Sequence, residues 1–224
     1  MKEETVFYRR NLPHIHPKDG MFFITFRLTG SLPANIIQQL KEDRKTRIQK
    51  LHKKFRNKEL EKEKYKLEKH FLGKFDDLLD SASDGPHWLK EERMAQIVAR
   101  KIHELHGKRY RLIAYCIMSN HVHLLIDITG FDASTTVTNI VGKTKDYPLT
   151  DTLRLLKGST ARMCNLELGQ SGAFWHQESY DHYVRNEREF GRVIQYILTN
   201  PVKAGLVEDW REWQFTHLAE SPSV

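Results

Sequence analysis

The sequence has few cysteines and no long apolar segment. Only Cys116 and Cys164 occur among 224 residues, far apart and without the close spacing of metal-binding or redox cysteines. We therefore expect neither a disulfide framework nor a cysteine-based zinc site. No apolar run approaches the roughly 20 residues that span a bilayer, and the opening Met-Lys-Glu-Glu lacks the apolar region of a signal peptide. These absences predict a cytoplasmic protein with no membrane partner.

One segment carries far more basic than acidic residues, and the positive excess of the chain is concentrated there. The whole chain carries a net charge of +7. Residues 41–70 contain thirteen basic and six acidic residues, so this segment holds the entire excess. Phosphate backbones are the usual target of such a segment, although a solvated helix face laced with ion pairs has the same composition. We call residues 41–70 the basic arm and expect it to contact a nucleic-acid backbone without sequence preference.

Apolar periodicity predicts an alternation of strands and helices. Strands are expected at residues 21–28, 109–117, 121–128 and 180–184, and helices at residues 34–80 (as one helix or a broken hairpin), 88–106, 149–168 and 186–200. Apart from the arm, this order resembles a split β-α-β arrangement. The predicted fold class is α+β, a ferredoxin-like antiparallel sheet with helices on one face plus an inserted long basic helical arm. We expect one domain over residues 1–224, with residues 34–106 as a helical insertion.

Two histidines one residue apart lie within a predicted strand. Side chains alternate faces along a strand, so His121 and His123 point to the same side while Val122 and Leu124 point to the other. Neutral imidazole is the commonest protein metal ligand, and two on one face leave positions on a divalent ion for water, substrate and one more protein group. A half-exposed strand whose polar face happens to carry histidine explains the same pattern.

The last predicted helix carries an aromatic residue away from its apolar face. Successive helical residues turn by about 100°, which places Tyr196 about 130° from the centre of the apolar arc. That arc contains Phe190, Val193, Ile194, Ile197 and Leu198. Asn200 lies one turn after Tyr196, so a phenol and an amide oxygen share one side with Glu189. Tyr196 and Asn200 are therefore either a nucleophile beside a metal ligand, or Tyr196 is a half-buried tyrosine that anchors a loop.

Three motifs contain or adjoin these candidate residues: Met118–Leu125, Phe174–Asn186 and Tyr196–Val207. Four further segments add to them, Tyr8–His14, Phe23–Pro33, Gly85–Leu89 and Lys157–Ala161. In combination they resemble the REP-associated tyrosine transposases, single-tyrosine HUH transposases that cut and rejoin single-stranded DNA. The likeness covers most of the chain. It departs from the family at Ser119, where proline is frequent, and at His176, where glutamine is common.

The resemblance implies an enzyme with a covalent mechanism. It would be a metal-dependent endonuclease and strand transferase that forms a 5′-phosphotyrosine intermediate at hairpin-containing DNA. By the same resemblance Tyr196 is the nucleophile, and His121, His123 and Asn200 hold Mg²⁺ or Mn²⁺. Mixed imidazole and amide ligation suits Mn²⁺ somewhat better than Mg²⁺.

Several cations and one further histidine are candidate contacts to DNA. They are Arg9, Arg10, Arg27, Lys157, His182 and Arg185. The expected partner is single-stranded DNA with hairpin-forming repeats, and a homodimer is possible. Two other functions remain open from the residues alone. One is a non-catalytic hairpin-binding protein domesticated from a transposase, and the other is a metal-dependent nuclease in which the histidine pair activates water.

Overall fold

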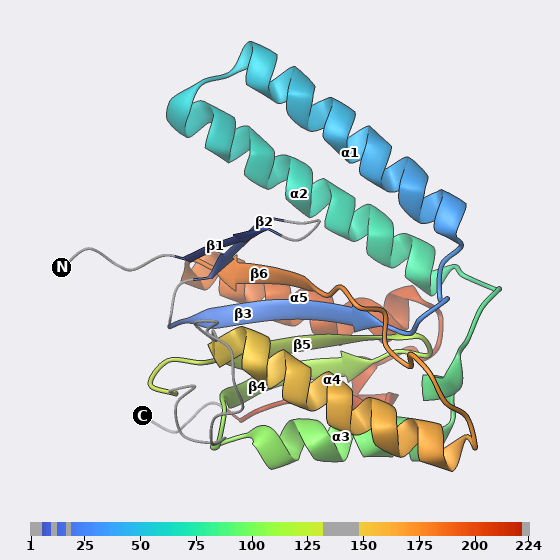
Figure 1. Ribbon diagram of the computed structural model, residues 1–224. Helices are drawn as coiled ribbons and strands as arrows, with labels where there is room; N and C mark the ends of the chain where they lie inside the picture. Colours follow the sequence, from blue (N-terminus) through green and yellow to red (C-terminus); the bar gives the residue numbers. More distant parts are fainter. Residues whose placement is uncertain (1–5, 10–12, 17–18, 132–147, 221–224) are drawn as a thin grey trace, which may run out of the picture. The chain divides into compact units, whose positions relative to one another are not determined.

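The computed structural model describes residues 6–9, 13–16, 19–131 and 148–220, the first two ranges by their backbone (Figure 1). The chain divides into two compact units, Met1–Leu28 with Trp88–Val224 and Thr29–His87. We call the first the sheet unit and the second the arm unit. Among the described residues, no helix combines the length and the apolar character that crossing a membrane requires.

The sheet unit is built on five antiparallel strands in the order β6-β3-β5-β4-β7. Their bounds are β3 Met21–Arg27, β4 Arg111–Ile117, β5 His121–Asp127, β6 Tyr180–Val184 and β7 Thr216–Leu218. β5 lies between β3 and β4, and β3 lies between β5 and β6, which is the predicted split β-α-β order. A separate ribbon pairs β1 Val6–Arg9 with β2 Pro13–His16. The predicted α+β class with an antiparallel sheet is confirmed.

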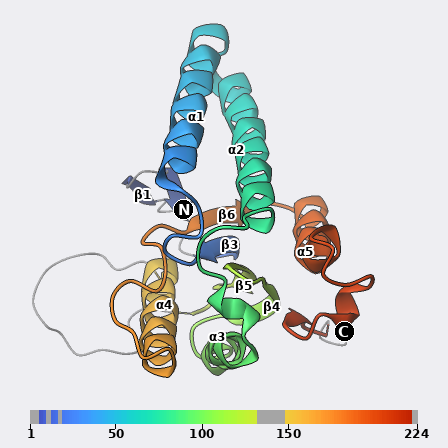
Figure 2. The ribbon, with the colours of Figure 1, turned by 90° about the vertical axis from the view of Figure 1, so that its right-hand side faces the viewer.

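Helices cover both faces of this sheet (Figures 1 and 2). The helical segments are a 3₁₀ turn at Trp88–Lys90, α3 Glu92–Leu105, α4 Pro148–Glu167, α5 Glu187–Lys203 and a 3₁₀ turn at Trp210–Glu212. α3 and α4 share one core cluster with the even-numbered residues of β3 and β5. α5 contacts the other face, where the ring of Tyr196 meets Phe23 and His123. The expectation of helices on one face therefore holds for α3 and α4, whereas α5 packs on the opposite side.

Alternation along the strands builds the core on the α3–α4 side. On β5, Val122, Leu124 and Ile126 are fully buried in the cluster. The buried indole of Trp175 joins them and donates its Nε1–H to the hydroxyl of Thr160 on α4, at 2.9 Å. Because the face toward α3 and α4 buries most of the apolar side chains of the sheet, the opposite face can carry polar side chains.

The arm unit contains the predicted broken helical hairpin. α1 spans Ala34–Lys54 and α2 spans Asn57–Asp80, and the chain reverses at Phe55 and Arg56. α1 has no buried residue, and α2 buries only Phe71, Asp76 and Leu79. α3 belongs to the sheet unit rather than to this hairpin. The assignment of residues 34–106 as an insertion in one domain stays a prediction.

The end of α5 differs from the sequence-based expectation, which ended the helix at Asn200. The helix continues through Pro201 to Lys203. Proline has no N–H to donate, but the next turn still closes because the Ala204 N–H donates to the Asn200 carbonyl at 3.0 Å. Asn200 therefore lies inside a regular turn, which fixes its side chain relative to Tyr196.

We predict that Leu124→Ala lowers the free energy of unfolding by about 2–5 kcal/mol, because it leaves a cavity in the closed core. The matched change Leu166→Ala, at a side chain 72% exposed, should cost less than about 0.5 kcal/mol. Urea denaturation of both variants gives the two values. Equal losses would mean that β5 is not the centre of the core.

Candidate active site

The histidine pair lies on the central strand of the sheet. β5 is hydrogen-bonded to β3 and β4 on both sides, and the Met118 N–H donates to the His121 carbonyl at 2.9 Å to close the preceding turn. His121 and His123 are both 0% exposed. Their Nε2 atoms are 3.0 Å apart, so the two rings converge on one point.

Hydrogen bonds at the Nδ1 atoms set the tautomer of His121 and allow both tautomers of His123. Nδ1 of His121 is 2.7 Å from Oδ1 of Asn120. An amide oxygen only accepts, so this Nδ1 carries the proton and the Nε2 of His121 presents a lone pair. Nδ1 of His123 is 2.9 Å from the hydroxyl of Thr25, which can donate or accept. When Thr25 accepts, both Nε2 lone pairs face the same point, and each ring has the oxygen partner that usually orients a metal-bound histidine.

Burial keeps both imidazoles neutral. It lowers the pKa of His121 to about 3. It also lowers the pKa of His123 well below its ordinary value, with smaller effects from His121 and Lys203. Only the neutral imidazole can bind a metal ion, so the pair is ready to act as a ligand at physiological pH.

The geometry of the pair fits one octahedral ion. Two ligand atoms about 2.1 Å from an ion lie about 3.0 Å apart when they meet it at a right angle, and this equals the observed Nε2 separation. The same distance suits a hydrogen bond from the Nε2–H tautomer of His123 to His121. Within the described ranges, no group of three His, Cys, Asp or Glu side chains forms a metal site. A third protein ligand would therefore come from another residue type.

Asn200 has the buried, unsatisfied oxygen that such a ligand needs. Its side chain is 1% exposed, and its Oδ1 has no hydrogen-bond partner among the described residues. A buried acceptor without a partner costs about 1–3 kcal/mol. Coordination of an ion would remove that cost, which makes the amide a candidate third ligand for an ion held by His121 and His123.

Tyr196 lies next to the histidine pair. Its ring centroid is 5.4 Å from that of His123 at an angle of 73°, and Phe23 packs against both rings at 5.7 and 5.8 Å. Asn200 follows one turn later on the same side of α5. The phenol and the amide therefore approach the histidine-bearing face of the sheet together.

The buried face of α5 is rotated from the one that the sequence predicted. Glu189 and Asn200 are 4% and 1% exposed, whereas Phe190 and Ile194 are only half-buried. The polar stripe that was expected to lie away from the apolar face thus faces the sheet. The reason is that the sheet face beneath α5 carries histidines and a threonine, which accept polar neighbours. Hydrophobic periodicity alone could not reveal this face.

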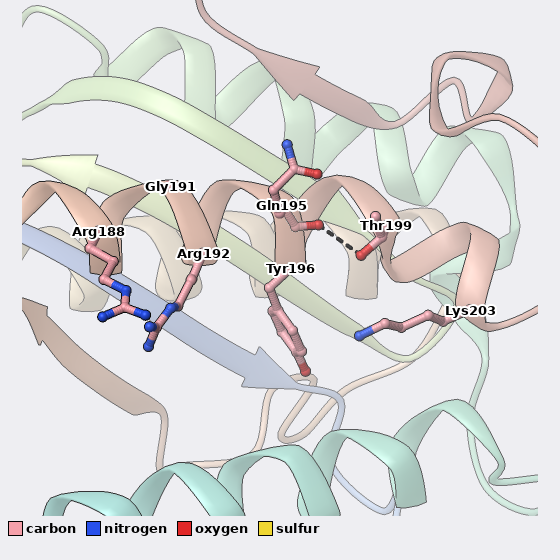
Figure 3. A pocket seen from close by; sticks show the side chains of 7 residues that line it. All are labelled: Arg188, Gly191, Arg192, Gln195, Tyr196, Thr199 and Lys203. Carbon is pink, nitrogen blue, oxygen red and sulfur yellow. Dashed lines mark hydrogen bonds between the residues drawn. The ribbon is translucent and has the colours of Figure 1, made fainter.

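An open pocket of about 470 Å³ lies along α5 beside Tyr196 (Figure 3). Its lining residues are Arg188, Gly191, Arg192, Gln195, Tyr196, Thr199 and Lys203. Arg188 and Arg192 lie four residues apart on α5 and both line this pocket (Figure 3). The Lys203 Nζ lies 5.0 Å from the centroid of the Tyr196 ring. Three cations therefore border the pocket that contains the phenol. Sequence reasoning missed them, although their spacing of threes and fours from Tyr196 was a usable signal.

Arg27 and His182 lie on the same sheet face as His123. Arg27 is opposite His121 in the β3–β5 ladder and is 3% exposed, and burial lowers its pKa to about 10. His182 is opposite Phe23 on β6, and its Nε2 is 3.0 Å from a carboxylate oxygen of Glu189. These two predicted residues therefore border the site on neighbouring strands.

The remaining predicted cations lie in other surroundings. The Lys157 ammonium on α4 donates to the carbonyls of His176 and Gln177 and to the hydroxyl of Ser179, at 2.9–3.1 Å. It thus anchors the segment before β6.

Arg185 is exposed directly after β6, and its backbone N–H donates to Glu189 at 3.1 Å. The side chain of Arg9, and Arg10 altogether, lie outside the described residues.

Comparisons with known proteins support the resemblance seen in the motifs. No family model matches the sequence. A protein of Haemophilus influenzae named "Putative REP-associated tyrosine transposase" is 25% identical over 107 residues, which cover 48% of this chain and 58% of that protein. The match thus spans little more than half of the relative's length.

A solved structure described as "Structure of the REP associates tyrosine transposase bound to a REP hairpin" matches with a TM-score of 0.50 at 16% identity. That match covers 93% of this chain and 80% of the other chain. The two proteins share the fold. The predicted likeness to REP-associated tyrosine transposases is therefore confirmed by a relative of that name and by a structure of that fold.

We predict opposite outcomes for one substitution at two buried asparagines. Asn200→Leu removes an unsatisfied oxygen and should leave the metal-free stability within about 1 kcal/mol or raise it. Asn120→Leu breaks the 2.7 Å bond to His121 and should cost about 1–3 kcal/mol. Urea denaturation in excess chelator measures both. A larger loss at Asn200 than at Asn120 would contradict the assignment of an unsatisfied oxygen.

Proposed function

We propose that the chain is a metal-dependent endonuclease and strand transferase for single-stranded DNA, of the transposase type. The observation that carries this proposal is the contact of Tyr196 with His123, one of two buried neutral imidazoles whose Nε2 atoms converge. The relative named as a tyrosine transposase and the fold of a transposase that was solved with a REP hairpin support the same class. The proposed substrate is DNA that contains a hairpin.

His121, His123 and Asn200 are the residues that would hold Mg²⁺ or Mn²⁺. A divalent ion at this place supplies Lewis-acid chemistry, because it neutralises and orients an anionic phosphodiester. The chain's own contribution is to keep both imidazoles neutral through burial and to orient them through Asn120 and Thr25.

Tyr196 is the proposed nucleophile. Its phenol oxygen loses a proton and attacks the phosphorus, and the bond from phosphorus to the 3′-oxygen breaks. The 3′-oxygen takes up a proton and leaves as a 3′-hydroxyl, while the 5′-phosphate stays on the tyrosine. The phosphodiester energy is conserved in this ester, so the same strand or another one can be joined by the reverse step. The Lys203 ammonium, 5.0 Å from the ring centroid, stabilises the negative charge that develops on the phenol.

Arg188 and Arg192 are the proposed contacts for neighbouring phosphates. They line the same pocket as Tyr196 and place positive charge along α5. Phosphate contacts fix the position of a strand without reading its sequence. Together with Lys203, these side chains would hold the backbone on each side of the scissile bond.

We predict that Tyr196→Phe lowers cleavage of a hairpin-bearing single strand by about a thousandfold or more, because it deletes only the attacking oxygen. Binding should change by less than about twofold. Tyr183→Phe, at a ring that packs on Phe22 5.6 Å away, is the matched control and should cleave normally. Denaturing gels follow the covalent adduct. Undiminished cleavage by Tyr196→Phe would favour water activated by the histidine pair, and absence of cleavage by the parent protein would favour a hairpin-binding protein.

We also predict that His121→Ala with His123→Ala abolishes Mn²⁺ binding and cleavage together. The matched control changes another histidine pair, His103 and His217, whose ring centroids are 4.9 Å apart near Tyr115. That control should keep both properties. Calorimetry measures Mn²⁺ affinity, and an unchanged affinity in the first variant would place the ion elsewhere.

A further inference from the structure

The turn that joins α1 and α2 carries a cluster of cations without any acid. We define the arm tip as residues 50–58, which contain five basic residues and no acidic one. These are Lys50, Lys53, Lys54, Arg56 and Lys58, and all five are exposed. None of them forms an ion pair with a described residue. The tip therefore has a local charge of +5.

The rest of the basic arm balances its charge internally. Residues 41–49 and 59–70 contain eight basic and six acidic residues. The side chain of Arg44 forms a bidentate pair with Glu68 across the two helices, with a shortest distance of 2.6 Å. Further pairs are Arg47–Asp43 at 3.0 Å, Lys64–Glu61 at 3.0 Å and Lys66–Glu63 at 2.6 Å. We call these two ranges the arm shaft, and its pairing leaves most of the net charge of the arm at the tip.

Helix stability does not explain the whole tip cluster. Lys53 and Lys54 lie in the last turn of α1, where cations interact favourably with the helix dipole. Arg56 donates to the carbonyls of His52 and Phe55, which closes the same helix end. Lys58, however, lies in the first turn of α2, where a cation is unfavourable. Lys50 lies one turn before the helix end and has no acidic neighbour within four residues.

We propose that the arm tip binds the phosphate backbone of double-stranded nucleic acid without reading its sequence. Lys50 and Lys54 are separated by about 6 Å of helix axis. A duplex presents one charge per about 1.7 Å of its axis, whereas a single strand presents about half as many. Lys50, Lys53 and Lys54 lie within this span, about one charge per 2 Å, which is close to the charge density of a duplex. Lysine is a point charge rather than a fork that fits base edges, which suits backbone contact.

This surface is independent of the proposed chemistry at Tyr196. Its role would be a second, non-specific attachment to paired DNA, such as a hairpin stem. Because the test can be done in a Tyr196→Phe background, failure of the catalytic proposal would not alter its readout.

The experiment compares two triple variants of identical composition. The tip variant is Lys50→Gln, Lys53→Gln and Lys58→Gln, and the shaft variant is Lys41→Gln, Lys45→Gln and Lys62→Gln, at exposed lysines that stand among acids. Glutamine has nearly the helix propensity of lysine, and circular dichroism checks that both variants keep their helices. Affinity for a duplex of about 20 base pairs and arbitrary sequence is measured between about 50 and 200 mM salt.

The tip variant should make the negative slope of log affinity against log salt shallower by about 0.9 for each phosphate that the protein no longer neutralises, so by about 2–3. The shaft variant should change the slope by less than about 0.5. Equal changes of slope in the two variants would overturn the proposal, because the net charge of the protein, and not the position of the lysines, would then determine DNA binding. An unchanged slope in the tip variant, or a greater loss on an unpaired strand than on the duplex, would also overturn it. The proposal would also be overturned if the tip variant still bound the duplex but no longer bound anionic vesicles, because the tip would then be a site for a lipid surface.

Discussion

The candidate site depends on the burial of two neutral imidazoles on the central strand of the sheet. Burial alone would leave four ring nitrogens without water, and the structure meets this cost with Asn120, Thr25 and the contact between the two rings. The Thr25 hydroxyl can donate or accept, so it serves both tautomers of His123. An incoming ion would then need only a shift of one proton between the two nitrogens of that ring. The pair can therefore be stable without an ion and ready to bind one.

The second constraint is the position of α5 on the histidine-bearing face. In the ferredoxin-like arrangement α3 and α4 close the apolar core, which leaves the opposite face to α5. The helix brings Tyr196 to His123 and buries the unsatisfied oxygen of Asn200 one turn later. Its continuation through Pro201 also places Lys203 beside the phenol. One helix thus carries the proposed nucleophile, a candidate ligand and a cation, at positions fixed by helical geometry.

The sequence predicted secondary structure best, because strands and helices follow from the spacing of apolar residues within one segment. The strand of His121 and His123, the helices and the hairpin of the arm follow from alternation and helical spacing, and the structure contains them. The buried face of α5 was not predictable, because its polar residues are buried by what lies across the interface rather than by their own pattern. The pairing of Arg44 with Glu68, 24 residues apart, likewise needs the hairpin geometry. Lys157 was expected to contact DNA phosphate, yet its ammonium donates hydrogen bonds to the segment before β6. No local sequence pattern indicates these contacts.

The most direct test of the account is the position of a metal ion in crystals grown with Mn²⁺, seen by anomalous scattering. The account predicts one strong peak about 2.1 Å from the Nε2 atoms of His121 and His123 and a similar distance from Oδ1 of Asn200. It also predicts that Thr25 then accepts from His123. A peak elsewhere, or a direct Nε2 hydrogen bond that persists at saturating Mn²⁺, would contradict the assignment of this pair as a metal site and with it the proposed chemistry at Tyr196.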